Sequence, residues 1–387
     1  MIYLFLSWLL SPLLYLRLAM RRSNPEPREI LLIQTAKIGD FICTTPLFRE
    51  IKRRYPCCRL SILLHPVNAP LAAQNPHIDA TLYYQSADYR GLRGRLRLFN
   101  LLRAHRFDTT ICVSPNLAFL LMPLWAGIPR RLAILPNYGG ASYRLAAPFL
   151  SAGEPHVSGR LVLETEFRLL RALDIQPASL DKEVYATPEA ESKAAAWLPA
   201  AIAHRKLFGI GLSSGNKLKE LGTEQLCGLI RLLLENPGNS VVLIGAAADR
   251  GQGEEIMQLL ANGQIVNGAG AFSLAELPAL LSRLAIYIGV DSGITYMADA
   301  LKIPVIDIMG PADADDQRPT GAQALVLRSK LACAPCSHAF KVPYQCAIGT
   351  RACITELAPS QIANLALDRL GRNLPIPRSG KSETPRK

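Results

Sequence analysis

ILLIQTAKIGDFICTTPLFREI (Ile30–Ile51) decides the fold of this chain, because it predicts a strand, a tight turn and a helix in direct succession. Ile30–Ile33 is an apolar run typical of a parallel strand that is covered on both faces. The turn ends on Gly39, which can adopt backbone conformations that are closed to other residues. In an open α/β sheet, ligands bind outside the carboxyl ends of the strands. We therefore expect Asp40, which follows this turn, to lie at a binding site.

Asp40 has a second interpretation, because Asp commonly caps the start of a helix. A similar unit later in the chain favours the functional interpretation: residues 285–290 predict a strand and residues 295–301 a helix. A helix N-terminus carries partial positive charge and unpaired N–H groups, so it binds anions readily. The turn between the two elements, Asp291-Ser292-Gly293, would supply a hydroxyl and an unobstructed amide there.

Three segments together resemble glycosyltransferase family 9, the lipopolysaccharide heptosyltransferases. They are IQTAKIGDFICTTPLFREIKRRYP (residues 33–56), GVDSGITYMADALKIPVIDIMGPAD (residues 289–313) and a Ser-rich loop with Lys219. The resemblance extends from Ile30 to about Leu370. It implies the GT-B fold, an α/β architecture in which two Rossmann-like, doubly wound domains face a central cleft.

Alternating strand and helix patterns support two α/β domains, and 387 residues suffice for both. We expect an acceptor-binding domain over residues 28–180 and a nucleotide-sugar-binding domain over residues 186–355. Residues 356–371 predict a last helix, which the resemblance implies crosses back onto the first domain. Residues 372–387 are rich in Pro, Lys and Arg and predict a disordered basic tail.

The resemblance implies an inverting transferase that moves a heptose from ADP-heptose to the lipopolysaccharide inner core or a related glycolipid. Asp40 matches the general base, and the acceptor-binding residues would be Lys37, Thr44 and Thr45. A carboxylate is ordinarily a weak base, so we expect burial to raise the pKa of Asp40. We expect the reaction to need no metal or other cofactor.

The donor site needs positive charge and N–H donors, because negative charge grows on the leaving diphosphate. The Ser-rich loop and Lys219 match the diphosphate-binding loop, and Asp249 matches an acidic residue against the ribose. Two departures stand out: Leu221-Gly222 replaces the usual Trp-Pro, and Tyr296 replaces a His near the donor sugar. The donor pocket is therefore expected to differ from that of a standard heptosyltransferase. The expected donor-binding residues are Ser213, Ser214, Gly215, Lys219, Asp249, Asp291, Ser292, Gly293 and Tyr296.

The net charge of +12 predicts a surface that attracts anions. No nucleic-acid-binding motif is present, so nucleic acid is not an expected partner. Residues 89–106 predict an amphipathic helix with several arginines, and we assign Leu92, Leu96, Phe99 and Leu102 to its apolar side. Its cationic side is either an ordinary solvated face or a contact with anionic lipid or acceptor phosphates.

Three rival functions remain open at this point. The first is a transferase that uses a different nucleotide sugar, which Tyr296 makes credible. The second is a sugar-nucleotide epimerase or hydrolase, because these enzymes share the GT-B architecture. The third is a membrane-bound binding protein without turnover.

Nine cysteines are present, and five are scattered through apolar or helical stretches, which suits a reducing compartment. The other four fall in one loop-rich segment with C-x2-C and C-x6-C spacings. The second spacing is wide for a zinc ribbon. These cysteines have two interpretations, which are structural packing or adventitious clustering on the one hand and a structural zinc site on the other: Cys333, Cys336, Cys346 and Cys353.

Residues 1–22 predict a membrane-anchoring helix. Ile2–Leu16 carries no charge, but a helix of this length reaches only about 22 Å, short of the roughly 30 Å hydrocarbon core. Pro12 interrupts it, and Arg17, Arg21 and Arg22 follow. We expect a monotopic anchor on the cytoplasmic face of the inner membrane, with the arginines at anionic headgroups. A single spanning helix is the alternative.

Overall fold

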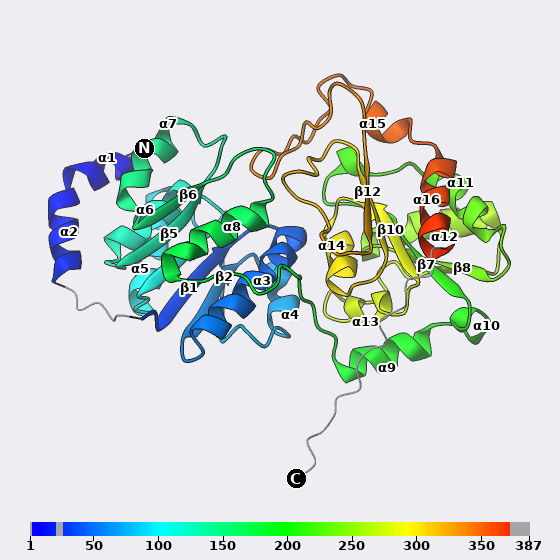
Figure 1. Cartoon of the computed structure of the whole chain (residues 1–387), viewed down its shortest axis with the longest axis horizontal. Helices are drawn as coiled ribbons and strands as arrows, with labels where there is room; N and C mark the ends of the chain where they lie inside the picture. Colours follow the sequence, from blue (N-terminus) through cyan, green and yellow to red (C-terminus); the bar gives the residue numbers. More distant parts are fainter. Residues whose placement is uncertain (1, 21–25, 372–387) are drawn as a thin grey trace, which may run out of the picture.

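The computed structural model describes residues 2–20 and 26–371, which form two α/β domains side by side (Figure 1). Each domain is built on one six-stranded sheet, and every pair of neighbouring strands is parallel. Helices cover both faces of each sheet, as expected for parallel strands that must be shielded from water on both sides. The expected fold of two doubly wound domains is confirmed.

The strand order in the first sheet is β3-β2-β1-β4-β5-β6. The order reverses between β1 and β4, and this topological switch point is where open α/β sheets bind ligands. The strands of this sheet are β1 Glu29–Gln34, β2 Arg59–Leu64, β3 Ala80–Tyr83, β4 Thr109–Cys112, β5 Arg130–Leu135 and β6 Ala152–Pro155. The helices of this domain are α3 Ile38–Arg54, α4 Ala69–Ala72, α5 Gly91–Ala104, α6 Leu117–Trp125, α7 Gly140–Ala146 and α8 Val162–Leu170.

The second sheet repeats this arrangement, with the order β12-β11-β10-β7-β8-β9 and its switch point between β7 and β10. Its strands are β7 Lys206–Gly211, β8 Asn239–Ile244, β9 Ile265–Asn267, β10 Ile286–Val290, β11 Val305–Met309 and β12 Ala324–Arg328. Its helices are α9 Pro188–Trp197, α10 Ala200–Ala203, α11 Thr223–Leu234, α12 Arg250–Leu260, α13 Leu277–Leu281, α14 Gly293–Ala300, α15 Ala352–Thr355 and α16 Pro359–Gly371.

Strand β1 shows how an unbroken apolar run serves two cores. Ile30 and Leu32 point into the cluster that contains the apolar residues of α3 and α8. Leu31 and Ile33 point to the opposite face, into the cluster that contains residues of α5 and α6. All four side chains are fully buried, so the run needs no polar alternation.

The two domains meet where α3 packs against α14, the helices that follow the two turns singled out in the sequence. One apolar cluster continues across this boundary, from Phe41 and Phe48 to Tyr296 and Met297. A Cβ atom at Gly293 would lie 2.7 Å from Cγ2 of Ile38. At Gly39 it would lie 3.1 Å from Cδ2 of Tyr296. The domains can therefore approach this closely only because both turns carry glycine.

From the sequence we expect glycine at position 39 because of its backbone conformation, and the structure shows a different reason. Gly39 lies within the first turn of α3 and is absent from the residues with positive φ. Its lack of a side chain is needed for close packing and not for backbone conformation.

Two expectations about helix packing are also wrong. In α5 the buried positions are Gly94, Leu98 and Leu102, whereas Leu92 and Leu96 are exposed. Phe99 and Leu102 of the expected apolar side do contact the core, and Leu98 joins them there in place of Leu92 and Leu96. The last helix, α16, packs against α11, β10 and β11 and not on the first domain, since Ile362, Ala363 and Ala366 complete the second domain's core.

The chain begins with two helices, α1 Ile2–Leu9 and α2 Ser11–Ala19, in place of one. They rest on the first domain, where Leu4 and Leu14 are buried in the cluster that α5 and α6 share. No single helix within residues 2–20 and 26–371 has the length and hydrophobicity to cross a membrane. The pair α1 and α2 meets these two criteria together but is bent by 63°. Residues 21 and 22 and the predicted tail at 372–387 lie outside the described residues.

Replacing Gly293 by Ala tests the glycine contact between the domains. The added methyl group collides with Ile38, so we expect a loss of about 1–3 kcal/mol in the free energy of unfolding and a larger radius of gyration. The control is Gly251→Ala, at an exposed position in α12 with no atom within 4 Å of the new Cβ, which should not destabilise the protein. Thermal unfolding and small-angle X-ray scattering measure both; an unchanged radius with unchanged stability contradicts the proposed contact.

Candidate active site at the domain boundary

The two switch points face each other across a cleft that holds two adjoining cavities, of about 410 Å³ and 350 Å³. Asp40 lines both. The larger cavity lies against the first domain and includes Tyr138, Glu166, Lys182 and Arg318. The smaller lies against the second domain, and the residues that line it include Lys37, Ser214, Gly215, Lys219, Asp291, Ser292, Gly293 and Tyr296. The structure thus brings most of the expected site residues to one place.

Asp40 lies in the first turn of α3, and Lys37 occupies the N-cap position. Asp40 is therefore not the helix cap, and its carboxylate lines the cleft. Burial, followed by the negative charge of Asp291, raises the pKa of Asp40 to about 6. Lys219 and a hydrogen bond from Gln317 act in the opposite direction and limit the rise. The carboxylate is thus a stronger base than an ordinary Asp and is still ionised near pH 7.

Asp291 follows β10 and organises the opposite wall. Its carboxylate forms an ion pair with Lys219. It also accepts a 2.7 Å hydrogen bond from the hydroxyl of Tyr296. Burial and the charge of Asp291 raise the pKa of Tyr296 well above its ordinary value, so the phenol stays protonated and donates. Tyr296, which stands where the family resemblance leads us to expect His, therefore holds Asp291 in position through this bond.

The loop after β7 supplies the remaining groups of the smaller cavity. Ser214, Gly215 and Lys219 line it together with Ser292 and Gly293 at the start of α14. The Lys37 ammonium lies 3.4 Å from the Gly215 carbonyl oxygen and so joins the two domains across the cleft. Two lysines, hydroxyls and a helix N-terminus around one cavity form an arrangement suited to a diphosphate.

Ser213 and Asp249 lie outside both cavities. The Ser213 hydroxyl donates to Asp249 at 2.6 Å, and the amide of Ala246 donates to the same oxygen at 2.7 Å. This carboxylate therefore holds the ends of β7 and β8 together. Its expected contact with a ribose stays a prediction.

Thr44 and Thr45 were expected to bind the acceptor, and the structure contradicts this. Both are buried within α3, because they fall on its inner face. The Thr44 hydroxyl donates to the Asp40 carbonyl oxygen and accepts from Gln34. The Thr45 hydroxyl donates to the Ile42 carbonyl oxygen and accepts from the Glu183 amide. These hydroxyls support the site from behind without reaching the cleft.

Glu166 in α8 is a residue of the larger cavity that the sequence analysis missed. It is 2% exposed, and its Oε2 atom has no hydrogen-bond partner, although Oε1 lies 3.3 Å from the Thr44 hydroxyl. Burial raises the pKa of Glu166 well above the usual value, so the side chain is a neutral acid that can donate a hydrogen bond into the cavity. In the sequence, the one feature that could have indicated this residue is a Glu among the apolar positions of VLETEFRLL (Val162–Leu170).

Lys182 was missed as well, and it lines the larger cavity from the segment between the domains. It pairs with Asp299 at 2.9 Å, and both side chains are almost fully buried. Asp307, in the centre of β11, is the third missed group, and neither of its oxygens has a hydrogen-bond partner. Burial, then the charge of Asp291, raises the pKa of Asp307, so it lies below the site as a neutral acid.

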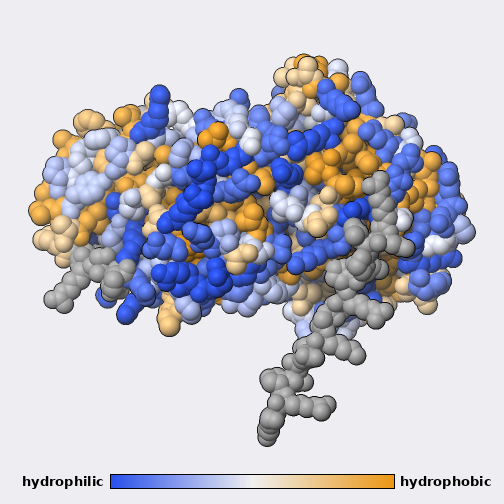
Figure 2. Space-filling model, viewed as in Figure 1, coloured by the Kyte–Doolittle hydropathy of each residue, from blue (hydrophilic) through white to orange (hydrophobic). Residues whose placement is uncertain are grey.

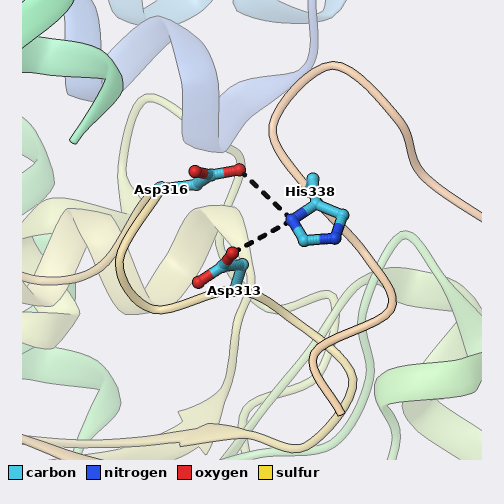
Figure 3. A group of neighbouring side chains, drawn as sticks. All are labelled: Asp313, Asp316 and His338. Carbon is cyan, nitrogen blue, oxygen red and sulfur yellow. Dashed lines mark hydrogen bonds and ion pairs between the residues drawn. The ribbon is translucent and has the colours of Figure 1, made fainter. Parts of the chain in front are cut away.

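Asp313, Asp316 and His338 form the only group of three or more His, Cys, Asp or Glu among the described residues whose potential metal-ligand atoms all lie within 4.8 Å of one another (Figure 3). Nδ1 of His338 lies 3.0 Å from Asp313 and 3.5 Å from Asp316. The buried Asp316 also lies 3.5 Å from His156 and accepts a hydrogen bond from the Gly159 amide of the first domain. The geometry is that of an imidazole bridging two carboxylates, and this network ties the second domain to the first.

Comparison with known proteins gives a consistent result. The family described as glycosyltransferase family 9 (heptosyltransferase) matches residues 95–345. Lipopolysaccharide heptosyltransferase 3 of Escherichia coli K12 is 26% identical over 73% of this chain and 82% of its own length. Lipopolysaccharide heptosyltransferase 2 of Salmonella typhimurium is 26% identical over 78% and 88%. The solved structure of E. coli ADP-heptose lps heptosyltransferase II superposes with a TM-score of 0.68 at 21% identity, covering 89% of this chain and 99% of its own.

The raised pKa of Asp40 has a measurable effect on stability. Well below pH 3.8 the carboxyl is neutral in both the folded and the unfolded protein, so it contributes nothing. From about pH 3.8 to 6 the folded protein holds this proton more tightly, and stability falls as pH rises. Asp40→Asn should therefore be more stable than the parent at pH 8, by about 1–3 kcal/mol, and much less so at pH 4.

Urea unfolding at both pH values measures this difference. Asp368→Asn, at an exposed position on α16, is the matched control and should show the same stability change at pH 8 and pH 4. If the two substitutions change the stability equally at pH 8, burial of the ionised Asp40 carboxylate does not destabilise the folded protein.

Proposed function

Because the chain belongs to glycosyltransferase family 9, we propose that it transfers a heptose from ADP-heptose to the inner core of lipopolysaccharide or a related glycolipid, with inversion at the anomeric carbon. The observation that carries this proposal is the position of Asp40, which lines one cleft together with Lys219 and the turn that opens α14. An acceptor cavity and a diphosphate cavity meet at this carboxylate. Transfer requires this arrangement, because the attacking and leaving groups must lie on opposite sides of the sugar.

The donor would bind in the smaller cavity, with its diphosphate at the N-terminus of α14. Ser292 and Gly293 offer N–H groups there, and Lys219 offers a positive charge held in place by Asp291. As the bond from the anomeric carbon to the diphosphate oxygen breaks, negative charge grows on that oxygen. Positive groups that are already in position stabilise this charge without reorganisation.

The acceptor would bind in the larger cavity, where Arg318 provides positive charge and Glu166 a neutral donor. Its hydroxyl attacks the anomeric carbon from the face opposite the diphosphate, and Asp40 takes the proton. With a pKa of about 6, Asp40 is mostly ionised at neutral pH but holds a proton better than an exposed Asp. We assign the chemical step to these groups without a catalytic metal or other cofactor.

Tyr296 bears on the identity of the donor. The phenol is buried and bonded to Asp291, so the pocket lacks the ionisable imidazole expected at this position. A transferase that uses another nucleotide sugar is therefore the second candidate. Thermal-shift measurements with ADP-, UDP-, GDP- and CMP-sugars separate the two, since the preferred donor raises the melting temperature most.

Asp40→Asn tests the catalytic assignment. The amide keeps the shape of the side chain but cannot accept the proton, so kcat should fall by orders of magnitude while the Kd for the donor changes little. The parent enzyme should lose activity as pH falls through about 6, when Asp40 becomes protonated. Asp368→Asn should retain the activity and pH profile of the parent. A kcat near that of the parent in Asp40→Asn removes Asp40 from the mechanism.

The membrane surface is the proposed location of the acceptor, on the cytoplasmic face of the inner membrane. α1 and α2 expose several large apolar side chains, and Figure 2 shows hydrophobic residues among polar ones at this end of the molecule. Arg95 of α5 lies 5.3 Å from the ring of Tyr3, so the basic helix borders the same surface. Such a combination suits shallow insertion beside anionic headgroups. The exposed apolar residues of α1 and α2 are Ile2, Phe5, Trp8, Leu9, Leu13, Tyr15 and Leu16.

Phe5→Glu combined with Leu13→Glu tests the membrane contact. Both side chains are more than 60% exposed, so the fold should be retained, whereas insertion of two carboxylates into lipid is unfavourable. We expect at least a tenfold loss of binding to vesicles of phosphatidylethanolamine and phosphatidylglycerol in a sedimentation assay. Leu259→Glu, at a 58% exposed position on α12 of the second domain, is the control and should bind like the parent. Equal binding of all three proteins would contradict the proposed surface.

A further inference from the structure

The four late cysteines come together in space, although their spacing in the sequence is irregular. All four line one small cavity of about 50 Å³, which is formed largely by the segment that connects β12 to α15. Leu218, Pro311 and Arg351 complete its wall. Cys333 and Cys336 are exposed residues, so packing into an apolar core does not explain them.

Cys346 lies in a turn built to hold a thiolate. Gly349, three residues later, has φ of +77°, a conformation that favours glycine. Backbone N–H groups, chiefly those of Arg351 and Ile348, hydrogen-bond to the Cys346 sulfur. Amides directed at a cysteine sulfur stabilise its anion in the same way as they stabilise other anions.

The other three cysteines lie with Cys346 around the same cavity. Metal ions bind cysteine as the thiolate, and a cation between the sulfurs would offset the repulsion among these anions. The cavity therefore places four potential sulfur ligands around one small space.

We propose that Cys333, Cys336, Cys346 and Cys353 together bind one thiophilic metal ion, zinc or iron, in tetrahedral coordination. Four sulfur ligands, two of them in a C-x2-C pair, are the donor set that these ions favour in structural sites. No three of the sulfurs lie within 4.8 Å of one another. The cysteine side chains must therefore rotate inward to reach the metal–sulfur distance of about 2.3 Å. The exposure of Cys333 and Cys336 leaves them room to do so.

The metal would fix the base of a loop that reaches across the cleft. Between Cys336 and Cys346 the chain extends from the second domain toward the first, as the orange segment of Figure 1 shows. His338 and Lys341 lie against the ring of Tyr138, and Phe340 lies against His156, at centroid distances of 5.0 to 5.5 Å. Residues of this loop line both cavities.

On the donor side the same loop is tied to the phosphate-binding segment. The Asn216 side chain donates to the Pro343 carbonyl oxygen at 2.9 Å, and Tyr344 lines the smaller cavity. A metal that holds both ends of this loop would therefore position it over the donor. The positioning of the loop over the donor rests on the proposed function, whereas the binding of the metal does not.

Metal content of the full-length protein tests the site. Protein purified under reducing conditions without chelator should contain close to one zinc or iron per chain by inductively coupled plasma mass spectrometry. Visible absorption then distinguishes the two, since iron–thiolate sites absorb there and zinc sites do not. Cys333→Ser combined with Cys346→Ser should lose the metal, and Cys57→Ser, at an exposed cysteine of the first domain, should retain it. Metal that persists in the double variant would be adventitious and would overturn the proposal.

Thiol counting on the parent protein avoids variants that fail to fold. Titration with a thiol reagent should detect about four more reactive thiols after a strong chelator has removed the metal than before, whereas exposed Cys57 should react in both cases. Metal-free protein with a Cys333–Cys336 disulfide in its peptide map would assign the cysteines to redox chemistry and overturn metal binding.

Removing the metal should raise the KM for the donor by at least several-fold with a smaller change in kcat. An unchanged KM, with metal present in the parent, would refute the loop's role alone. Absence of transferase activity in the metal-loaded protein bears on the proposed function and leaves the metal site standing.

Discussion

The rest of the structure depends on the close contact between the turns that open α3 and α14. Gly39 and Gly293 remove the side chains that would separate these turns, and a shared apolar cluster holds the helices together behind them. Because each turn follows a strand at a topological switch point, this contact brings two ligand-binding edges to one cleft. The position of Asp40 beside Lys219 and Ser292 follows directly from it.

Charge in the cleft is arranged so that only some of its acids are ionised. Asp291 is held by Lys219 and Tyr296, and its negative charge raises the pKa of the nearby Asp40. Glu166 and Asp307 are buried on the two sides with raised pKa values, so they remain neutral. A site with these four acids can therefore bind an anionic donor, which four carboxylates would repel.

Sequence reasoning predicted the elements and the cleft residues that occur next to strand ends. Asp40 and Asp291 could be found because a strand, a turn and a helix are local patterns, and parallel strands place their ends at one edge. Lys37 and Lys219 were assigned through the family resemblance. Thr44 and Thr45 were misplaced because the pattern does not say which side of α3 faces the cleft. Leu92 and Leu96 were misplaced for the same reason on α5, where two apolar faces compete.

The amino-acid sequence by itself determined two doubly wound α/β domains and the turns that carry Asp40 and Asp291, because apolar runs and glycine turns act locally. Only the tertiary structure decided the neighbours of these acids. Glu166 lies far from Asp40 along the chain, and the four cysteines are separated by uneven spacings, yet each set shares one cavity. Burial and charge at a site depend on contacts between distant segments, and those contacts arise only when the domains pack.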